Sequence, residues 1–221
     1  MQFYTFVYVL IAVQQQTMQL LQQGIKFIID FLFALGVTIF ILTWLVPLLW
    51  ITNLFVDGGP LFFSHQREGK DCKLFRCYKF RTIPSTAKHV KPGESFNIKT
   101  TFLGTLLRNT GIDELPQAIN ILKGEMSVVG PRPHLPEYNA YYQSFVGKPH
   151  MDKRLQVLPG LTGLAQVRGY RGDTPNEASI KNRIDSDAEY VEHQSLWLDL
   201  KIIFLSAIAL FRGIWKHIFR R

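Results

Sequence analysis

Cysteine is scarce in this chain of 221 residues, which contains only Cys72 and Cys77. Their spacing is neither the C-x-x-C of redox sites nor a zinc pattern, which argues against a disulfide framework and a structural zinc site. The six histidines are scattered and form no convincing pair with another ligand at helical spacing, which argues against a transition-metal site. Two free thiols are typical of a reducing, cytoplasmic compartment.

Charge is missing from the N-terminal quarter, apart from Lys26 and Asp30. The first residues have no basic start and no small-residue cleavage site, so a removable signal peptide is not expected. The uncharged run Phe31–Val56 is long enough to be a membrane segment. Pro47 interrupts it, because proline lacks a backbone donor and clashes with the preceding helical turn, so it kinks or breaks a helix.

Two topologies follow from this interruption. Residues 31–46 would rise only about 24 Å as a helix, short of the roughly 30 Å hydrocarbon core. Either a kinked helix spans the membrane with the N-terminus outside, or the helix enters, breaks at Pro47 and returns to the same face. In both cases the basic residues that follow place the next domain in the cytoplasm. A buried helix of a soluble protein is the third reading, which the length and the lack of charge disfavour.

The C-terminal end repeats the apolar pattern on a smaller scale. The run Ile202–Phe211 is too short to span a membrane, and aromatic and basic residues follow it, including Trp215 and Phe219. We interpret it as a helix in the membrane interface, with an ordinary amphipathic helix packed on the core as the alternative. The sequence thus divides into an uncharged extension (1–24), a membrane helix (25–56) and a cytoplasmic domain (57–221).

Basic residues outnumber acidic ones by 25 to 17, which gives a net charge of +8. Such a chain attracts anions, whether nucleic acid, anionic lipid or phosphorylated substrates. The segment Lys73–Thr82 is rich in β-favouring residues and predicts a strand, in which Lys79 and Arg81 emerge on one face. The pair forms either an anion site or a solvated face. Further on, Arg132 lies between two prolines, and a rigid loop presenting one guanidinium suits phosphate recognition.

Two adjacent carboxylates, Asp113 and Glu114, precede a predicted helix that has Pro116 in its first turn. The simpler interpretation is structural, with Asp113 as the helix cap and Glu114 at the positive end of the dipole. The functional interpretation is an ionised, oriented carboxylate that serves as a nucleophile or metal ligand. The glycine-rich stretch at 158–172 matches neither a Walker loop nor G-x-G-x-x-G, so it adds little to a phosphate site.

Four segments taken together resemble the bacterial sugar transferases, the monotopic phosphoglycosyl transferases that begin capsule, exopolysaccharide and O-antigen assembly. They read GGPLFFSHQREGKDCKLFRCYKFRT, LGTLLRNTGIDELPQAINILKGEMSVVGPRP, LPGLTGLAQVRGYRGDT and YVEHQSLWLDLKIIF. The resemblance covers about Lys26–Gly213, and DELPQ followed by GPRP at this spacing is its most specific part. The last two segments are most similar to the undecaprenyl-phosphate glucose phosphotransferase branch.

The resemblance implies an enzyme that transfers a hexose-1-phosphate from UDP-glucose or UDP-galactose to undecaprenyl phosphate, releases UMP and uses Mg²⁺. It implies a catalytic and metal-binding dyad at Asp113 and Glu114, with a covalent phosphosugar on Asp113. Its conserved pattern implies phosphate or substrate contacts from Lys79, Arg81, Arg108, Gln117 and Arg132. It implies a location at the bacterial inner membrane with the catalytic domain on the cytoplasmic face.

The family's broken, re-entrant helix falls around Pro47 and favours the second topology. The expected fold is therefore a mostly helical α/β domain on a monotopic membrane helix, and we allow for a homodimer. Three departures from the family pattern, Ile83, Ile112 and Glu125, leave the dyad intact. The rival hypothesis is a non-catalytic basic adaptor that binds anionic lipid. A nucleic-acid binder fits the charge but lacks a stacking pattern or known motif.

Overall fold

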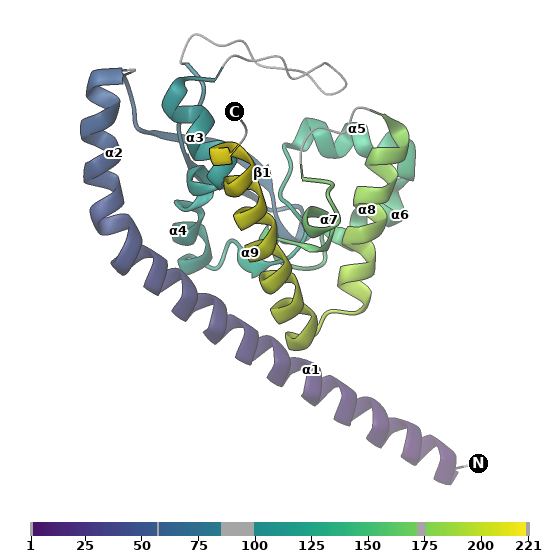
Figure 1. Cartoon of the computed structure of the whole chain (residues 1–221). Coiled ribbons are helices and arrows are strands. Elements are labelled where there is room, and N and C mark those ends of the chain that lie inside the picture. The colour runs from purple at the N-terminus through teal and green to yellow at the C-terminus, as the bar shows by residue number, and fades with distance from the viewer. Residues whose placement is uncertain (1, 57, 85–99, 172–175, 220–221) are drawn as a thin grey trace.

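The computed structural model describes residues 2–56, 58–84, 100–171 and 176–219, and of residues 2–12, 15, 102 and 213–219 only the backbone. Helices dominate this part of the chain and the sheets are small, as the sequence predicts (Figure 1). The elements run in the order α1 (Gln2–Val37), η1 (Thr38–Leu42), α2 (Thr43–Val56), β1 (Phe62–Glu68), η2 (Lys70–Cys72), β2 (Leu74–Phe80), α3 (Phe102–Thr110), η3 (Ile112–Glu114), α4 (Gln117–Leu122), β3 (Ser127–Val129), α5 (Pro136–Val146), α6 (Lys148–Arg154), β4 (Gly160–Thr162), α7 (Leu164–Val167), α8 (Glu177–Glu192) and α9 (Leu196–Phe219).

The predicted strand over residues 73–82 is confirmed by β2, which pairs with β1 in an antiparallel hairpin. In this register Phe63 lies opposite Lys79 and Arg67 lies opposite Phe75. Residues directly opposite each other in an antiparallel pair point to the same face, and so do residues two apart along a strand. Lys79 and Arg67 therefore share one face of the hairpin. The second sheet is the short parallel pair β3 and β4.

The first 56 residues form one helical run, in which Pro47 lies inside α2. The expected break at Pro47 is therefore wrong, since the helix continues through it. The run changes direction between α1 and α2 (Figure 1). The π-helical turn η1 ends five residues before Pro47, and a π turn and a proline are both recognised causes of helix kinks. Helix α1 also runs without interruption across the boundary drawn at residues 24 and 25.

One side of this helical run is buried against the rest of the molecule. The buried residues are Asp30, Ala34, Val37, Leu42, Leu45, Leu49 and Asn53. Consecutive members are three or four positions apart except between Val37 and Leu42, where the step is five and the backbone is π-helical. At roughly 100° per residue, a regular α-helix would place Asn53 about 140° around the axis from Asp30. The wider π turn rotates less per residue, which keeps the buried side chains on one side.

The opposite side of the helical run is apolar and exposed, with Phe40 at 76% and Phe55 at 86% exposure. Helix α9 carries a similar exposed row at Trp197, Leu200, Phe204 and Phe211, on one face of the helix by its spacing. One stretch, Gln16–Val56, is long and apolar enough to cross a membrane by length and composition. Apolar faces of this extent are typical of lipid contact.

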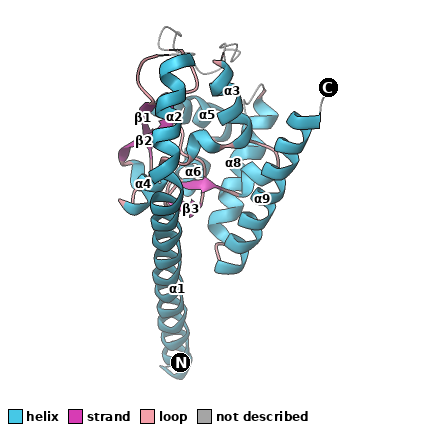
Figure 2. Cartoon of the chain, turned by 60° about the vertical axis from the view of Figure 1, so that its left-hand side comes forward, coloured by secondary structure: helices cyan, strands magenta, loops and turns pink. Residues whose placement is uncertain are grey.

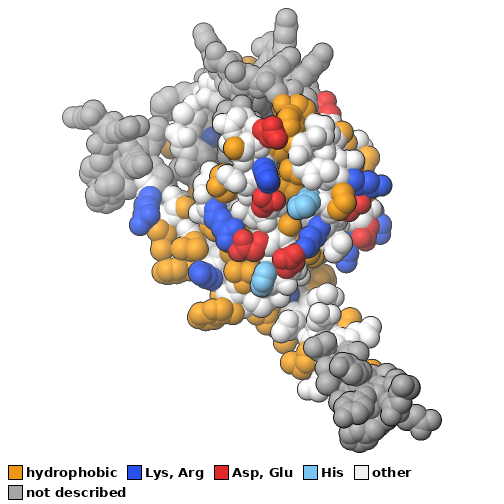
Figure 3. Space-filling model, turned by 90° about the vertical axis from the view of Figure 1, so that its right-hand side faces the viewer, with side chains coloured by type: hydrophobic (Ala, Val, Ile, Leu, Met, Phe, Trp, Pro, Cys, Tyr) orange, Lys and Arg blue, Asp and Glu red, His pale blue; other side chains and the backbone are white. Residues whose placement is uncertain are grey.

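The predicted C-terminal interfacial helix corresponds to α9, although the side chains of Trp215 and Phe219 lie outside the described part. The α9 helix and the α1–α2 run lie on different sides of the globular part, and the first half of α1 projects away from it (Figure 2). The face on the side of α6 and α8 instead shows interspersed acidic, basic and histidine side chains (Figure 3). Such a mixed, charged face is typical of contact with water.

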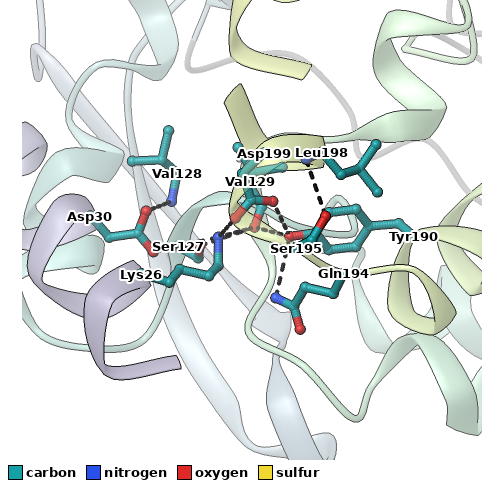
Figure 4. Close-up of polar contacts among 10 residues, drawn as sticks. All are labelled: Lys26, Asp30, Ser127, Val128, Val129, Tyr190, Gln194, Ser195, Leu198 and Asp199. Atoms are coloured by element: carbon teal, nitrogen blue, oxygen red, sulfur yellow. Dashed lines mark hydrogen bonds and ion pairs between the residues drawn. The ribbon is translucent and has the colours of Figure 1, made fainter. Parts of the chain in front are cut away.

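A buried polar cluster ties α1 to the domain (Figure 4). The Lys26 ammonium donates to Asp199 Oδ2 of α9 at 2.7 Å and to the Val129 carbonyl at 3.1 Å. The Tyr190 hydroxyl donates to the other oxygen of Asp199 at 2.7 Å, and the Val129 carbonyl lies 3.0 Å from the same hydroxyl. One ammonium and one phenol thus satisfy a carboxylate that is only 6% exposed.

The second carboxylate of the cluster, Asp30, lies one helical turn after Lys26, at 3.8 Å from its ammonium. Asp30 accepts hydrogen bonds from the Ser127 hydroxyl at 2.6 Å and from the Val128 N–H at 3.2 Å. Strand β3 is thereby held against α1. Burying such charges is costly unless they are paired and hydrogen-bonded, so the cluster requires all of its members.

We predict that Lys26→Met lowers the stability of the protein. The change leaves Asp30 and Asp199 buried without their cation, and loss of one partner of a buried pair costs on the order of 3–5 kcal/mol. Thermal unfolding in detergent micelles should therefore show a clearly lower Tm. Lys201→Met is the matched control, because Lys201 lies exposed on α9. Equal melting temperatures for the two variants would contradict the prediction.

Candidate functional site

The Asp113–Glu114 pair lies in the 3₁₀ turn η3, between helices α3 and α4. Gly111 ends α3 with a φ of 69°, a left-handed conformation that glycine adopts without strain. The expected capping role of Asp113 is wrong, because the residue that precedes α4 is Pro116 and no side chain caps that helix. Both carboxylates are nevertheless buried, at 7% and 6% exposure. A buried carboxylate outside a capping position needs another source of stabilisation.

Glu114 receives this stabilisation from three cations. Its Oε1 accepts from Lys79 Nζ at 2.8 Å and from Arg132 Nη2 at 2.6 Å, and its Oε2 accepts from Arg132 Nη1 at 3.2 Å. Arg171 Nη2 lies 3.9 Å from Oε2. Burial alone would raise the pKa of Glu114, but the charges and hydrogen bonds of Arg132 and Lys79 hold it well below its usual range. Glu114 is therefore a fixed anion.

Asp113 is in the opposite situation. Among the described residues it has no hydrogen-bond or ion-pair partner. Burial raises its pKa, and the adjacent charge of Glu114 raises it further, against the opposing effects of Lys79, Arg132 and Arg108. Asp113 therefore does not receive the stabilisation that was expected from a helix N-terminus. The pair divides into one carboxylate that is held by cations and one that has no partner among the described residues, which we call the open carboxylate.

The loop that carries Arg132 is held in place from behind. Arg154, which is buried, donates to the Arg132 carbonyl at 2.5 Å and to Asp187 at 3.0 Å. Gly130 approaches the strand β4 region so closely that a Cβ on Gly130 would lie 2.4 Å from the Leu158 carbonyl oxygen. The predicted rigidity of this loop therefore has two sources beyond its prolines, a buried arginine and a backbone contact that only glycine allows.

The remaining predicted residues lie at different distances from this chemistry. Arg108 donates from Nε to Thr82 Oγ1 at 2.9 Å, and its charge acts on Asp113. Gln117 is buried at the start of α4. Arg81 instead donates to the Pro60 carbonyl at 2.7 Å.

Arg81 also binds the end of α2, where its Nη2 donates to Asn53 Oδ1 at 3.2 Å and to the Gly58 carbonyl. Lys79 lies within β2 and binds the dyad, whereas Arg81 follows the last residue of that strand. The geometry therefore gives Arg81 a structural role in fastening the α2–β1 turn, which differs from the phosphate contact that the resemblance implies.

Two arginines near the dyad were not among the predicted site residues. Arg67 donates to the Pro133 carbonyl at 3.2 Å, and burial lowers its pKa, with the charge of Arg132 adding to the effect. No carboxylate of the described residues lies within ion-pair distance of Arg67. Its signal in the sequence was the hairpin face that it shares with Lys79. Arg171 belongs to the glycine-rich stretch that matched no phosphate motif.

A divalent metal fits the open carboxylate. Among the residues that the structure describes, no three His, Cys, Asp or Glu side chains gather as a ready-made metal site. Mg²⁺, however, usually keeps several waters and binds one or two carboxylates together with substrate phosphates. Asp113 offers such an oxygen ligand, and Glu114 offers one only if its cations are displaced.

Several known proteins are similar to this chain over most of its length. A family profile described as "Bacterial sugar transferase" matches residues 21–213. A UDP-glucose:undecaprenyl-phosphate glucose-1-phosphate transferase of Xanthomonas campestris pv. campestris is 40% identical over 153 residues, which is 68% of this chain and 31% of that protein. A Klebsiella pneumoniae protein of the same name is 39% identical over 188 residues, 83% of this chain and 40% of that one.

The exopolysaccharide production protein PSS of Rhizobium leguminosarum bv. phaseoli is 39% identical over 175 residues, 75% of this chain and 86% of that protein. Two further relatives are named for galactose, a galactosyl transferase and an undecaprenyl-phosphate galactose phosphotransferase. The match to the Xanthomonas campestris protein spans only about a third of that protein's length. The match over most of this chain is sufficient to conclude that it belongs to the bacterial sugar transferase family.

Proposed function

We propose that this protein transfers a hexose-1-phosphate from a UDP-sugar to undecaprenyl phosphate and releases UMP. The observation that carries the proposal is the asymmetry of the dyad, in which Glu114 is held by Lys79 and Arg132 while Asp113 is open. An open carboxylate beside a cluster of cations suits nucleophilic attack on a phosphate. The names of the relatives support the donor and acceptor classes.

The reaction would proceed in two displacements at the same phosphorus atom. An oxygen of Asp113 attacks the phosphorus that bears the sugar, the bridging P–O bond of the diphosphate breaks, and UMP leaves with the bonding electrons. A phosphate oxygen of the lipid acceptor then attacks that phosphorus, and the bond to Asp113 breaks. The second displacement returns Asp113 as a carboxylate, so the enzyme is regenerated without a further reactant.

The cations would serve both displacements. Two of these cations, Lys79 and Arg132, bind Glu114, and the third, Arg108, binds Thr82. Together they would stabilise the charge that develops on the transferred phosphate and on the departing UMP. Glu114 keeps the guanidinium of Arg132 oriented through two hydrogen bonds. Mg²⁺, when bound through Asp113 and the substrate phosphates, would neutralise part of the diphosphate charge.

We further propose that the α1–α2 run enters the membrane from the cytoplasmic side and returns to it. Lys26 binds Asp199, and 27 positions later Asn53 binds Arg81 and the Gly59 carbonyl. A helix of that length extends about 40 Å. Because both ends of this stretch are attached to the same domain, they lie on the same side of the bilayer as that domain. This supports the re-entrant topology over the spanning one.

The first prediction for this function concerns the dyad. Asp113→Asn keeps the size of the side chain but removes the nucleophile, so turnover should fall by roughly 10³-fold or more. Intact mass of the wild-type protein mixed with UDP-sugar and Mg²⁺ alone should show a hexose-phosphate adduct on Asp113. Glu114→Gln should slow both displacements, because Arg132 loses its orienting partner. Glu189→Gln, an exposed carboxylate paired with Arg168, is the control and should behave as wild type.

The covalent scheme would be wrong if no adduct forms and UMP release strictly requires the lipid. Asp113 would then act in a direct transfer within a ternary complex.

A second prediction concerns topology. We expect a cysteine introduced at Thr5, in a Cys72→Ser background, to resist a membrane-impermeant thiol reagent in intact cells and to react after lysis. The native Cys72, which is exposed on the catalytic domain, provides the cytoplasmic reference in a separate sample. Labelling at position 5 in intact cells, with none at Cys72, would favour a spanning helix.

A third prediction concerns the donor, for which we propose UDP-glucose or UDP-galactose. Purified protein supplied with undecaprenyl phosphate and one UDP-sugar at a time should release UMP fastest with one of these two hexoses. The relatives that are named for glucose or galactose support this choice. Strong turnover with an N-acetylated UDP-sugar and none with either hexose would overturn it.

A further inference from the structure

A cavity of about 280 Å³ adjoins the dyad, with Glu114 on its wall. Its other walls include residues of α1, β3, α9 and the consecutive elements β4 and α7. Most lining side chains are hydrocarbon, among them Phe33, Leu161, Val167, Ile203, Ala207 and Leu210. A cavity of this size takes a small ligand or the first part of a longer one.

The polar end of the cavity carries one cation. Arg171 lies 3.9 Å from Glu114 Oε2, and the described residues offer it no closer partner. Its guanidinium lies close to Gly111, since a Cβ added there would lie 3.2 Å from Arg171 Nη2. The Arg171 side chain is 43% exposed. It is therefore a cation at the mouth of an apolar cavity, beside the reacting carboxylates.

The opposite end of the cavity lies toward the apolar surface. Phe33 is 43% exposed and lies in α1, which has many other exposed apolar side chains. Leu210 comes from α9, whose exposed row includes Phe211. On the wall between, the hydroxyls of Thr162 and Ser206 are hydrogen-bonded to each other at 2.6 Å. The same wall includes Gln166, whose buried Oε1 has no hydrogen-bond partner among the described residues.

We propose that this cavity binds the first isoprene units of the polyprenyl phosphate acceptor, with Arg171 contacting its phosphate. The ligand has an anionic head and a branched apolar chain, which matches a cavity with a cation at one end and hydrocarbon walls. Its head would lie beside Asp113, where the second displacement requires it. The assignment rests on the function proposed above and adds the place where the acceptor binds.

A photocrosslinking experiment tests the site without requiring turnover. The probe is a farnesyl phosphate that carries a diazirine on its second isoprene unit, added to the full-length protein in detergent. Adducts should map to the peptides that contain Phe33 and residues 203–210, and excess undecaprenyl phosphate should suppress them. Adducts confined to the exposed row of α9, or adducts that UDP-glucose suppresses and prenyl phosphate does not, would overturn the proposal.

Kinetics provide the second test. Ala207→Phe fills the cavity and should raise the KM for undecaprenyl phosphate by about tenfold or more, while the KM for the UDP-sugar stays unchanged. Leu205→Phe is the control, because Leu205 lies on the same helix, partly exposed and outside the cavity. Arg171→Ala should raise the same KM, and Arg171→Lys should restore part of the loss.

The proposal is wrong if Ala207→Phe raises the KM for the donor instead or changes neither constant. A wild-type protein that makes no lipid-linked product from any UDP-sugar would contradict the proposed function itself, and the crosslinking result would still report on the cavity.

Discussion

The charge of Lys26 organises the junction between the membrane helix and the domain. Its ammonium lies between Asp30 on its own helix and Asp199 on α9, and the same cluster fixes β3 through Ser127. Strand β3 leads directly into the loop that carries Arg132. The position of Arg132 thus depends on contacts that also hold helix α1. The same contacts thus hold both the candidate site and the proposed membrane helix. Such an arrangement suits the proposed reaction, which has one water-soluble and one lipid substrate.

In the proposed reaction the two carboxylates of the dyad, which are about equally buried, have different roles. Three cations surround Glu114, and Asp113 lies beside them without a partner of its own in the described structure. A single carboxylate could not serve both purposes. If it bound the cations it would no longer be unpaired, and if it stayed unpaired the cations would have no partner to orient them. With Glu114 as their fixed counter-charge, the cations keep their geometry before any substrate arrives. Such preorganisation is where electrostatic catalysis gains most of its effect.

The sequence predicts local features of this site better than its long-range ones. The β-favouring residues of Lys73–Thr82 were sufficient to predict β2, because this pattern is local. The three cations around Glu114 could not be predicted from sequence spacing, since Lys79, Arg132 and Arg171 come from three distant segments. The capping role of Asp113 failed because Gly111 turns the chain before α4 begins. Tertiary contacts decided each of these points.

The membrane segment illustrates the same limit. Proline correctly indicated that the helix is not straight. The irregular backbone, however, is the π turn that ends five residues before Pro47, and the helix continues through the proline. Between Asp30 and Asn53 the chain holds one residue more than a regular α-helix needs, because 22 steps of roughly 100° would leave the two residues only about 40° apart. Deletion of one residue here would be absorbed by loss of the π turn, whereas an insertion would require a second one. Length is therefore under tighter constraint in this helix than the identity of its lipid-facing side chains.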